Sequence, residues 1–188
     1  MAKQISRRQK VINTTLKLLS NGGFHASPMS EVAQISKVAV GTIYHHFPSK
    51  EALFDAVHLE TCTEMAKLSN EIYANKSLKP AAKLTQLWVL LYQYLIDEPQ
   101  RYHALIQYRN TPPHIGNTEL EGALTAIKEI IKEGQKQNKF SKLHVSVLFE
   151  MWFSMIIAAV RIRVVQKKKL TGSEIKDLAQ QAVSALKK

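Results

Sequence analysis

Side chains that can donate hydrogen bonds gather in one short stretch of this sequence, between Gly41 and Lys50. If the stretch is helical, Ile43 and Phe47 stand four residues apart and share a face that packs against a core. The polar side chains then lie together on the exposed side; they are Thr42, Tyr44, His45 and His46. Such a surface suits an external partner with many hydrogen-bond acceptors, such as a nucleic acid.

The position of Lys50 is the second chemical signal in this stretch. Pro48 is expected to end the helix, because the residue before a proline leaves the helical region. Ser49 can then cap the next helix, which places Lys50 in its first turn. A lysine there opposes the helix macrodipole, so its position needs another explanation. Contact with a phosphate would supply one.

The same residues resemble a known family. From Gly41 to Leu53 the chain reads GTIYHHFPSKEAL, which is similar to the pattern G-T-[IL]-Y-x-[HY]-F-x-S/N-K-E-x-L of the TetR family of bacterial transcriptional repressors. The resemblance extends back through Arg8 and Gly23-Phe24 and covers roughly residues 6–60. It implies an N-terminal helix-turn-helix domain that binds DNA and a C-terminal helical domain that binds a ligand and forms dimers.

The resemblance also implies which residues hold the DNA backbone. By position, Tyr44, His46 and Lys50 would contact phosphates. Ser27, at the start of the preceding helix, would add a phosphate contact through its hydroxyl or through the free amides behind it. The alternative for Tyr44 and His46 is that they pack against neighbouring helices, and only the whole pattern favours DNA contact.

Four positions remain to face the bases: Val40, Gly41, Thr42 and His45. Val40 can touch only a thymine methyl, Thr42 can use its methyl and its hydroxyl, and His45 can form one hydrogen bond to a purine. Gly41 allows close approach. No Arg, Asn or Gln belongs to this set, so we expect specificity to depend partly on DNA shape and on dimer spacing.

Two residues depart from the family pattern in the turn before these positions. Lys37 stands where the family usually has glycine, and Ala39 stands where it usually has a capping Ser or Thr. The left-handed conformation that glycine supplies there would cost a lysine about 1 kcal/mol, and the missing cap would cost about as much, so the geometry of the turn stays open. Lys37 can compensate by reaching a phosphate itself.

The charge distribution agrees with a nucleic-acid partner. The chain carries a net charge of +11; residues 1–50 hold seven Lys/Arg and one acid (7 − 1 = +6), and residues 51–188 hold nineteen and fourteen (19 − 14 = +5). More than half of the excess therefore lies at the N-terminal end, as expected of an electrostatic footprint for DNA. Without the motif, a solvated basic face would be the preferred explanation, because it accounts for most charge excesses.

The remaining bulk features indicate a cytoplasmic protein. The single cysteine, Cys62, excludes an internal disulfide and is compatible with a reducing compartment. No apolar run follows the basic N-terminus, so no signal peptide is expected. The most apolar segment, Val147–Val160, is fourteen residues long, short of the roughly eighteen needed to span a membrane, so we expect no membrane segment.

The hydrophobic periodicity predicts an all-α fold of about nine helices. Ser27 and Pro28 are read as the cap and first residue of the second helix. We place a helix-turn-helix DNA-binding domain at residues 1–48 and a ligand-binding and dimerisation domain at residues 49–188. The expected helices are 6–21, about 28–36, 39–47, 50–73, 80–97, 99–108, 118–137, 142–168 and one from 173, with a loop at 109–117.

The helix expected at about 142–168 is apolar nearly all round, so it must be buried on two sides. One side can face its own domain and the other a second subunit. With the final helix, whose stripe includes Ile175, Leu178 and Leu186, it predicts a homodimer through the last two helices. Glu150 can pair with a basic side chain across the dimer or meet a cationic ligand. The alternative is a core formed entirely within one chain.

Candidate ligand-pocket residues are the large apolar and aromatic side chains of the C-terminal domain, because the resemblance implies an unknown small-molecule effector bound there. They are Met65, Trp88, Tyr92, Ile106, Trp152 and Met155. Side chains of these types at helical spacing are more often simple core residues, and this alternative stays open.

No enzyme, metal or cofactor is expected. His58 and Cys62 are four residues apart, a spacing that can bind one metal, but no third ligand accompanies them. The sequence has no phosphate loop, no nucleophile elbow and no HExxH, so we identify no catalytic residue.

The sequence therefore predicts a dimeric repressor that binds a palindromic operator in double-stranded DNA. A small molecule is expected to release the protein from that operator. Two alternatives remain: a DNA-binding regulator controlled by a protein partner, and an all-α enzyme or adaptor whose basic end serves an acidic partner.

Overall fold

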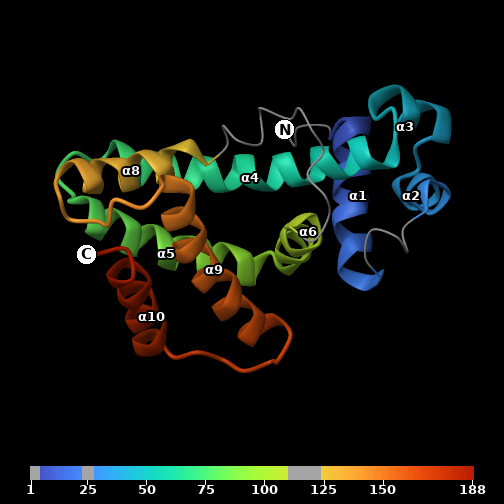
Figure 1. The fold of residues 1–188 in the computed structure, drawn as a ribbon. Coiled ribbons are helices and arrows are strands. Elements are labelled where there is room, and N and C mark those ends of the chain that lie inside the picture. Colours follow the sequence, from blue (N-terminus) through green and yellow to red (C-terminus); the bar gives the residue numbers. More distant parts are fainter. Residues whose placement is uncertain (1–4, 23–27, 110–123) are drawn as a thin grey trace. The chain divides into compact units, whose positions relative to one another are not determined.

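We describe residues 5–22, 28–109 and 124–188 in a computed structural model of the chain (Figure 1). Within these residues the secondary structure is entirely helical, which confirms the all-α prediction. The described helices are α1 (Arg7–Gly22), α2 (Met29–Ser36), α3 (Val40–His46), α4 (Lys50–Ala74), α5 (Pro80–Asp97), α6 (Pro99–Arg109), α8 (Thr125–Lys136), α9 (Val145–Val164) and α10 (Gly172–Ser184). Of the loop predicted at 109–117, Arg109 is instead the last residue of α6, and residues 110–117 lie outside the described residues, as does the start of the helix predicted at 118–137.

The chain divides into two compact units. The first consists of Met1–Thr61 and Pro99–Gly116, and the second of Cys62–Glu98 and Asn117–Lys188. The first unit therefore contains more than the predicted DNA-binding domain 1–48: it also includes the first half of α4 and the whole of α6.

The first unit is built around a core to which α1, α2, α3 and the start of α4 contribute. Ile43 and Phe47 are buried in it, as their spacing predicts. Helix α6 packs along α1. The side-chain amide of Gln107 on α6 donates a hydrogen bond to the carbonyl oxygen of Leu19 in the last turn of α1, at 2.8 Å. Helix α6 is thus part of the scaffold that holds α1 in place.

The second unit is organised around α5, which packs against α8, α9 and α10. Its apolar stripe is fully buried, as predicted; it comprises Leu84, Leu87, Trp88, Leu91 and Leu95. Lys83 is buried beside this stripe, and its Nζ donates to the carbonyl oxygen of Tyr73 at 3.0 Å and lies 3.7 Å from Oε2 of Glu133. The lysine therefore joins the end of α4 to α5 and α8.

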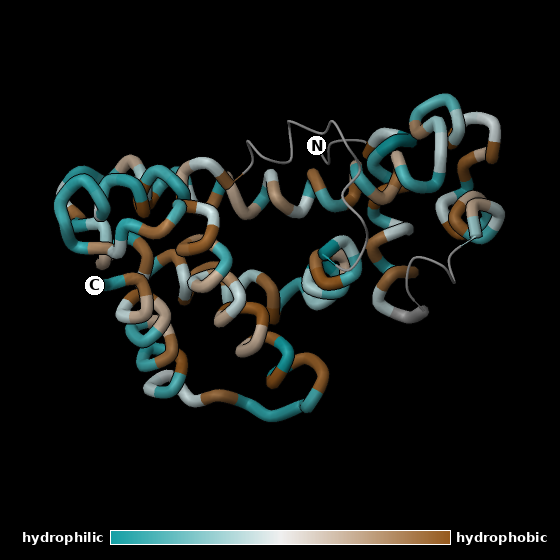
Figure 2. The backbone as a smooth tube through the Cα atoms, in the orientation of Figure 1, coloured by the Kyte–Doolittle hydropathy of each residue, from teal (hydrophilic) through white to brown (hydrophobic). Residues whose placement is uncertain are grey.

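Helix α9 is shorter than predicted at both ends. It begins after His144, whose Nδ1 accepts a hydrogen bond from the backbone of Ser146 at 3.3 Å. Beyond α9 the chain turns hydrophilic (Figure 2), and Lys167 adopts a left-handed conformation with φ of 59°. The hydroxyl of Thr171 then caps α10 in a capping box with Glu174, whose carboxyl pKa these hydrogen bonds lower.

The length argument against a membrane segment was wrong. The apolar run is part of a 20-residue helix, α9, which is long and apolar enough to cross a membrane. One such helix is weak evidence, because a core helix of a soluble protein passes the same test. Seven of its residues are buried within the chain: Leu148, Phe149, Trp152, Phe153, Ile156, Ala159 and Val160.

Candidate nucleic-acid interface

The turn between α2 and α3 keeps a left-handed residue at the position where the family usually has glycine. Lys37 has φ of 56° and ψ of 38°, the left-handed region that glycine adopts without cost. The amide of Val38 then bonds to the carbonyl oxygen of Ala33 at 3.2 Å, which closes the end of α2. The Lys37 side chain is exposed. The turn is thus formed without glycine, and it carries a positive charge where the family usually has no side chain.

Helix α3 starts without a side-chain cap, as the sequence predicts, because Ala39 offers no acceptor. Its first bond runs from the amide of Ile43 to the carbonyl oxygen of Ala39 at 3.0 Å. It ends when Phe47 takes an extended conformation before Pro48. Because Ile43 and Phe47 hold one face in the core, the opposite face of this short helix is left to solvent.

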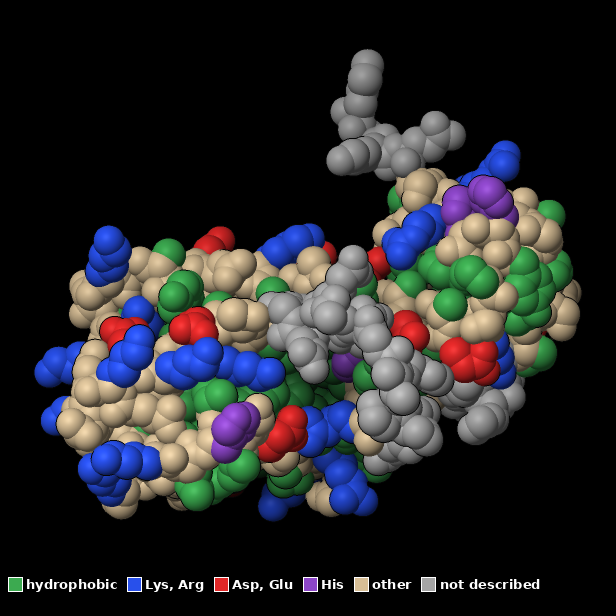
Figure 3. All heavy atoms as spheres, turned by 45° about the horizontal axis from the view of Figure 1, so that its top comes forward, with side chains coloured by type: hydrophobic (Ala, Val, Ile, Leu, Met, Phe, Trp, Pro, Cys, Tyr) green, Lys and Arg blue, Asp and Glu red, His purple; other side chains and the backbone are tan. Residues whose placement is uncertain are grey.

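The candidate DNA-binding residues of α3 lie on that exposed face. Val40 and Tyr44 are 41% and 45% exposed, so neither is a buried core residue. His45 and His46 are exposed, with ring centroids 5.6 Å apart in an edge-to-face arrangement. Histidine side chains lie beside Lys and Arg side chains over the α3 part of the first unit (Figure 3).

Gly41 and Thr42 complete the surface of α3. Gly41 is exposed, and a Cβ added to it would meet no atom within 4 Å. The fold itself therefore does not require glycine there. Thr42 is half-buried, whereas its neighbours Gly41 and Tyr44 are exposed. Less of the Thr42 side chain is therefore accessible to a partner.

The start of α4 matches the predicted cap. Oγ of Ser49 accepts a hydrogen bond from the amide of Ala52 at 3.1 Å, and Lys50 is the first residue of the helix. The Lys50 side chain is half-buried. Ser27 lies outside the described residues, and α2 begins one residue later than predicted, with Pro28 at the capping position and no side-chain cap bond. Pro28 is therefore not the first helical residue.

Arg8 is a further candidate that sequence reasoning did not include among the DNA contacts. Its guanidinium carbon lies 5.3 Å from the centre of the Phe47 ring, so the charge of α1 is held beside the end of α3. The side chain is exposed. Two features of the sequence could have identified Arg8 as a candidate. The family resemblance extends to this residue, and helical periodicity places it off the core face of the first helix.

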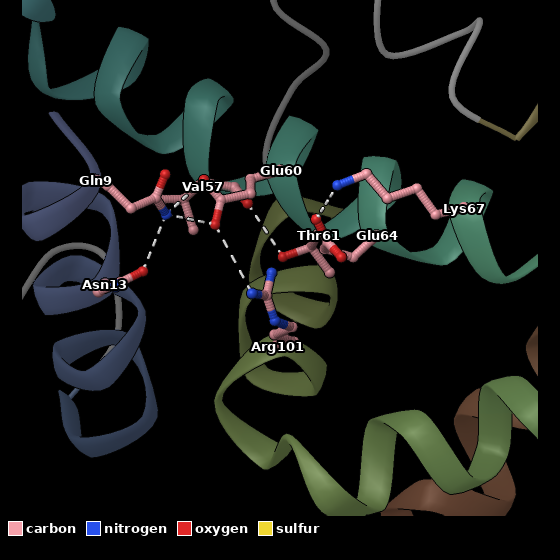
Figure 4. Close-up of polar contacts among 8 residues, drawn as sticks. All are labelled: Gln9, Asn13, Val57, Glu60, Thr61, Glu64, Lys67 and Arg101. Carbon is pink, nitrogen blue, oxygen red and sulfur yellow. Dashed lines mark hydrogen bonds and ion pairs between the residues drawn. The ribbon is translucent and has the colours of Figure 1, made fainter. Parts of the chain in front are cut away.

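A polar cluster inside the first unit joins three helices (Figure 4). Nε2 of Gln9 on α1 lies 2.7 Å and 2.9 Å from the two carboxylate oxygens of Glu60 on α4, and 3.1 Å from Oδ1 of Asn13. Arg101 of α6 lies 3.7 Å from Oε1 of Glu60. The cluster therefore fixes α4 and α6 to the helix that carries Arg8.

An aromatic stack lies between α4 and α6 in the same unit. The rings of His58 and Tyr108 are parallel within 4°, with centroids 3.7 Å apart, and Phe54 lies 5.6 Å from Tyr108. Burial lowers the pKa of His58 from 6.5 to about 4, and the positive charge of Arg109 adds to this effect. His58 is thus a neutral core residue at physiological pH.

The six candidate ligand-pocket residues divide between the units. Met65, Trp88, Tyr92, Trp152 and Met155 belong to the second unit, whereas Ile106 belongs to the first. Trp88 stacks on Tyr92 with centroids 5.8 Å apart, and both are buried, as are Met65 and Trp152. Burial raises the pKa of Tyr92, which the charge of Arg163 opposes. A pocket at these residues stays a prediction.

A metal site has no support in the described part of the chain, where no group of three His, Cys, Asp or Glu side chains is placed to hold an ion. His58 and Cys62 are both buried, and burial raises the pKa of the Cys62 thiol to about 12. The thiol is therefore protonated and unreactive at neutral pH.

Comparison with known proteins gives two family matches. Residues 11–57 match the bacterial regulatory proteins of the tetR family, and residues 82–187 match the tetracyclin repressor-like C-terminal domain. The second match alone spans more than half of the chain.

Individual relatives are similar over shorter stretches or in fold alone. The HTH-type transcriptional repressor KstR of Rhodococcus jostii is 49% identical over 47 residues, which are 25% of this chain and 22% of that protein. The chain spans only about a quarter of the length of such curated relatives.

Solved structures match nearly the whole chain. A TetR-family transcription regulator from Shewanella sp. PV-4 has a TM-score of 0.83 at 22% identity, covering 97% of this chain and 98% of that one. FadR from Bacillus subtilis, solved with stearoyl-CoA, has a TM-score of 0.74 at 19% identity, covering 93% and 95%. With these matches, the exposed face of α3 and the left-handed turn before it, the chain belongs to the tetR family of bacterial regulatory proteins.

Proposed function

We propose that this protein is a dimeric, sequence-specific repressor that binds a palindromic operator and releases it when a small molecule binds to the second unit. The observation that carries the proposal is the exposed face of α3, where hydrogen-bonding and cationic side chains surround a short helix anchored by Ile43 and Phe47. A helix of this diameter fits the major groove of B-DNA.

On the DNA, the side chains divide into two roles. Tyr44, His46 and Lys50 hold phosphates, and Lys37 replaces the missing cap contact by reaching a phosphate from the turn. Ser27 adds a contact at the start of α2. Arg8 is placed by its contact with Phe47 to contribute a further positive charge. These contacts are independent of sequence and set the position of α3.

The bases are read by Val40, Gly41, Thr42 and His45. Because this set lacks a bidentate donor, each contact discriminates weakly, and operator choice depends on DNA shape and half-site spacing as well. A base-substitution series in which one G·C pair per half-site dominates the affinity would contradict this proposal.

The effector is a small molecule held by the second unit, with Met65, Trp88, Tyr92, Trp152 and Met155 as candidate contacts. The similarity in fold to a regulator solved with stearoyl-CoA makes a long-chain acyl thioester the first compound to test. The chain acts in the cytoplasm, where its DNA is. The competing function, control by a protein partner, predicts that no small molecule alters DNA binding.

The test is selection from randomised duplex DNA, followed by affinity measurements on the recovered site. Lys50→Ala and Tyr44→Phe are expected to weaken binding, whereas Lys139→Ala, which removes an exposed charge from the second unit, is expected to leave it unchanged. Recovery of a palindrome supports the proposal, and weak binding without sequence preference refutes it. Stearoyl-CoA and other amphiphiles are then titrated into the complex to find the effector.

A further inference from the structure

The two tryptophans of the chain are Trp88 on α5 and Trp152 on α9. Both are fully buried in the second unit, and the indole nitrogen of each, Nε1, has no hydrogen-bond partner among the described residues. An indole N–H can only donate a hydrogen bond, and a buried donor without an acceptor destabilises the folded state. The two donors therefore indicate acceptor atoms that the described part of the chain does not supply.

The surroundings of these donors are apolar and aromatic. Helices α5 and α9 pack against each other, so the two tryptophans come from neighbouring helices (Figure 1). On α5, the ring of Tyr92 stacks on Trp88 with centroids 5.8 Å apart and planes within 9°. On α9, Trp152 begins a buried stripe that continues with Ile156 and Val160. A molecule that reaches the indole N–H groups must therefore present an apolar body to this interior.

Arg163 occupies the end of the same stripe of α9. It stands eleven residues after Trp152, which at about 100° per residue returns to within about 20° of the same direction. Its side chain is half-buried, and the ion pairs in the described part of the chain join other residues. A half-buried guanidinium without a carboxylate from its own chain is suited to an external anion.

The charge of Arg163 also acts on the aromatic pair of α5. Burial raises the pKa of Tyr92, and the positive charge of Arg163 opposes this rise, so the guanidinium lies near the Tyr92 hydroxyl. A guanidinium donates two parallel hydrogen bonds to a carboxylate, and a phenol can donate a third. The two side chains can therefore serve one anionic group.

We propose that the effector of the second unit is an elongated organic acid, with its carboxylate at Arg163 and Tyr92 and an oxygen acceptor on its apolar body for the indole N–H groups of Trp88 and Trp152. This inference rests on the proposed small-molecule effector and specifies its chemical class. The eleven residues between Trp152 and Arg163 correspond to about 16 Å along α9, so a molecule that reaches both is long rather than compact.

Two other classes of small molecule fit these residues less well. A cationic ligand would be repelled by Arg163. A saturated fatty acid would satisfy the guanidinium but would leave both indole donors without acceptors. The residues therefore favour a molecule that carries a negative charge at one end and an oxygen along its body.

The first test compares matched probes by isothermal titration calorimetry on the full-length protein, below the concentrations at which the probes form micelles. Oleate lacks the hydroxyl that ricinoleate carries on its body, and methyl ricinoleate lacks the negative charge. Ricinoleate is expected to bind at least roughly tenfold more tightly than either, because each comparison probe leaves one set of donors unpaired.

Each comparison can contradict one part of the proposal. Equal affinities for ricinoleate and oleate overturn the acceptor on the body, and equal affinities for ricinoleate and its methyl ester overturn the carboxylate. Absence of binding by all three probes overturns the proposed class.

The second test removes the charge of the site. Arg163→Gln is expected to weaken ricinoleate binding at least roughly tenfold, and Arg163→Lys should recover part of the loss, because lysine keeps the charge but not the planar fork. The matched control is Arg161→Gln, which removes the same charge from an exposed residue on another side of α9 and should bind ricinoleate like wild type. Unchanged circular dichroism and melting temperature show that each variant folds. Equal losses for Arg163→Gln and Arg161→Gln overturn the site.

The third test observes the indole donors directly. Because the chain has two tryptophans, a proton–nitrogen correlation spectrum contains two indole signals, which Trp88→Phe and Trp152→Phe assign. Ricinoleate is expected to move both signals downfield, as a new hydrogen bond from an N–H does, and oleate is expected to move them less. Signals that stay in place when ricinoleate binds overturn the role of the tryptophans.

The ligand class and the proposed function fail in different ways. If ricinoleate binds as expected but leaves the affinity for the selected operator unchanged, the ligand class stands and release by a small molecule is refuted. If stearoyl-CoA releases the operator and Arg163→Gln responds to it like wild type, the repressor function stands and the organic-acid site is overturned.

Discussion

The side-chain amide of Gln9 on α1 lies 2.7 Å from Oε1 and 2.9 Å from Oε2 of Glu60 on α4, two residues separated by fifty-one positions in the sequence. Arg101 of α6 approaches the same carboxylate, so one acidic side chain joins three helices of the first unit.

Glu60→Ala is expected to lower the free energy of unfolding by about 1–3 kcal/mol, because it leaves Gln9 and the largely buried Arg101 without this partner. Urea denaturation of the full-length protein measures the effect. The matched control is Glu64→Ala, one turn further along α4. Its ion pair with Lys67 is exposed, so the loss should stay below about 0.5 kcal/mol. Equal losses for the two variants would contradict the role of Glu60.

Lys37→Gly is expected to separate stability from DNA binding. The change should stabilise the protein by up to about 1 kcal/mol, because it removes the cost of a left-handed lysine at φ of 56°. If the lysine holds a phosphate, DNA affinity should fall, and the slope of log affinity against log salt should decrease in magnitude by about 1.

Lys37→Asn is the control for that comparison, since asparagine tolerates the left-handed region but lacks the charge. Lys37→Asn should therefore show the same decrease in the salt slope of DNA affinity as Lys37→Gly. Fluorescence anisotropy over a series of salt concentrations supplies both slopes, and an unchanged slope would remove Lys37 from the interface.

Gly41→Ala tests whether the glycine is required by the fold or by the DNA. Because an added Cβ would meet no atom within 4 Å, the variant should be as stable as wild type or up to about 1 kcal/mol more stable. If the backbone of α3 approaches the bases closely at this point, the affinity for the selected operator should nevertheless fall. Unaltered DNA binding would show that Gly41 is dispensable.

The pH dependence of stability should carry the signature of His58. The pKa of His58 is about 4 in the folded protein and near 6.5 in the unfolded chain. Between pH 4 and 6.5 the imidazole is therefore protonated in the unfolded state and neutral in the folded state. Stability is therefore complete above pH 6.5 and decreases as the pH falls towards 4, by at most about 3 kcal/mol.

His58→Phe, which keeps a ring to stack on Tyr108, should flatten the pH dependence between pH 6.5 and 4. Denaturation midpoints measured at several pH values test this expectation. If the stability of His58→Phe still fell between pH 6.5 and 4, the pH dependence would have to come from other groups.

Two glycines of the second unit should respond oppositely to alanine. A Cβ on Gly134 would overlap the buried ring of Phe140, so Gly134→Ala should destabilise the protein by about 1–3 kcal/mol. Gly172, the first residue of α10, has nothing within 4 Å of an added Cβ, and Gly172→Ala should be neutral or slightly stabilising. Thermal unfolding followed by circular dichroism distinguishes the two.

The sequence by itself determined the features that depend on neighbouring residues. The spacing of Ile43 and Phe47 defined the exposed face of α3, and Pro48 and Ser49 defined the boundary between α3 and α4. Caps, turns and helical faces are set by interactions within a few positions, so they can be read from a local pattern.

Tertiary structure decided the features that join distant positions. Gln9 meets Glu60, His58 stacks on Tyr108, and α10 packs on α5. Periodicity reveals that a face is apolar or polar but not which element covers it. For the same reason, the 20-residue extent of α9 and the assignment of α6 to the first unit emerged only from the folded chain.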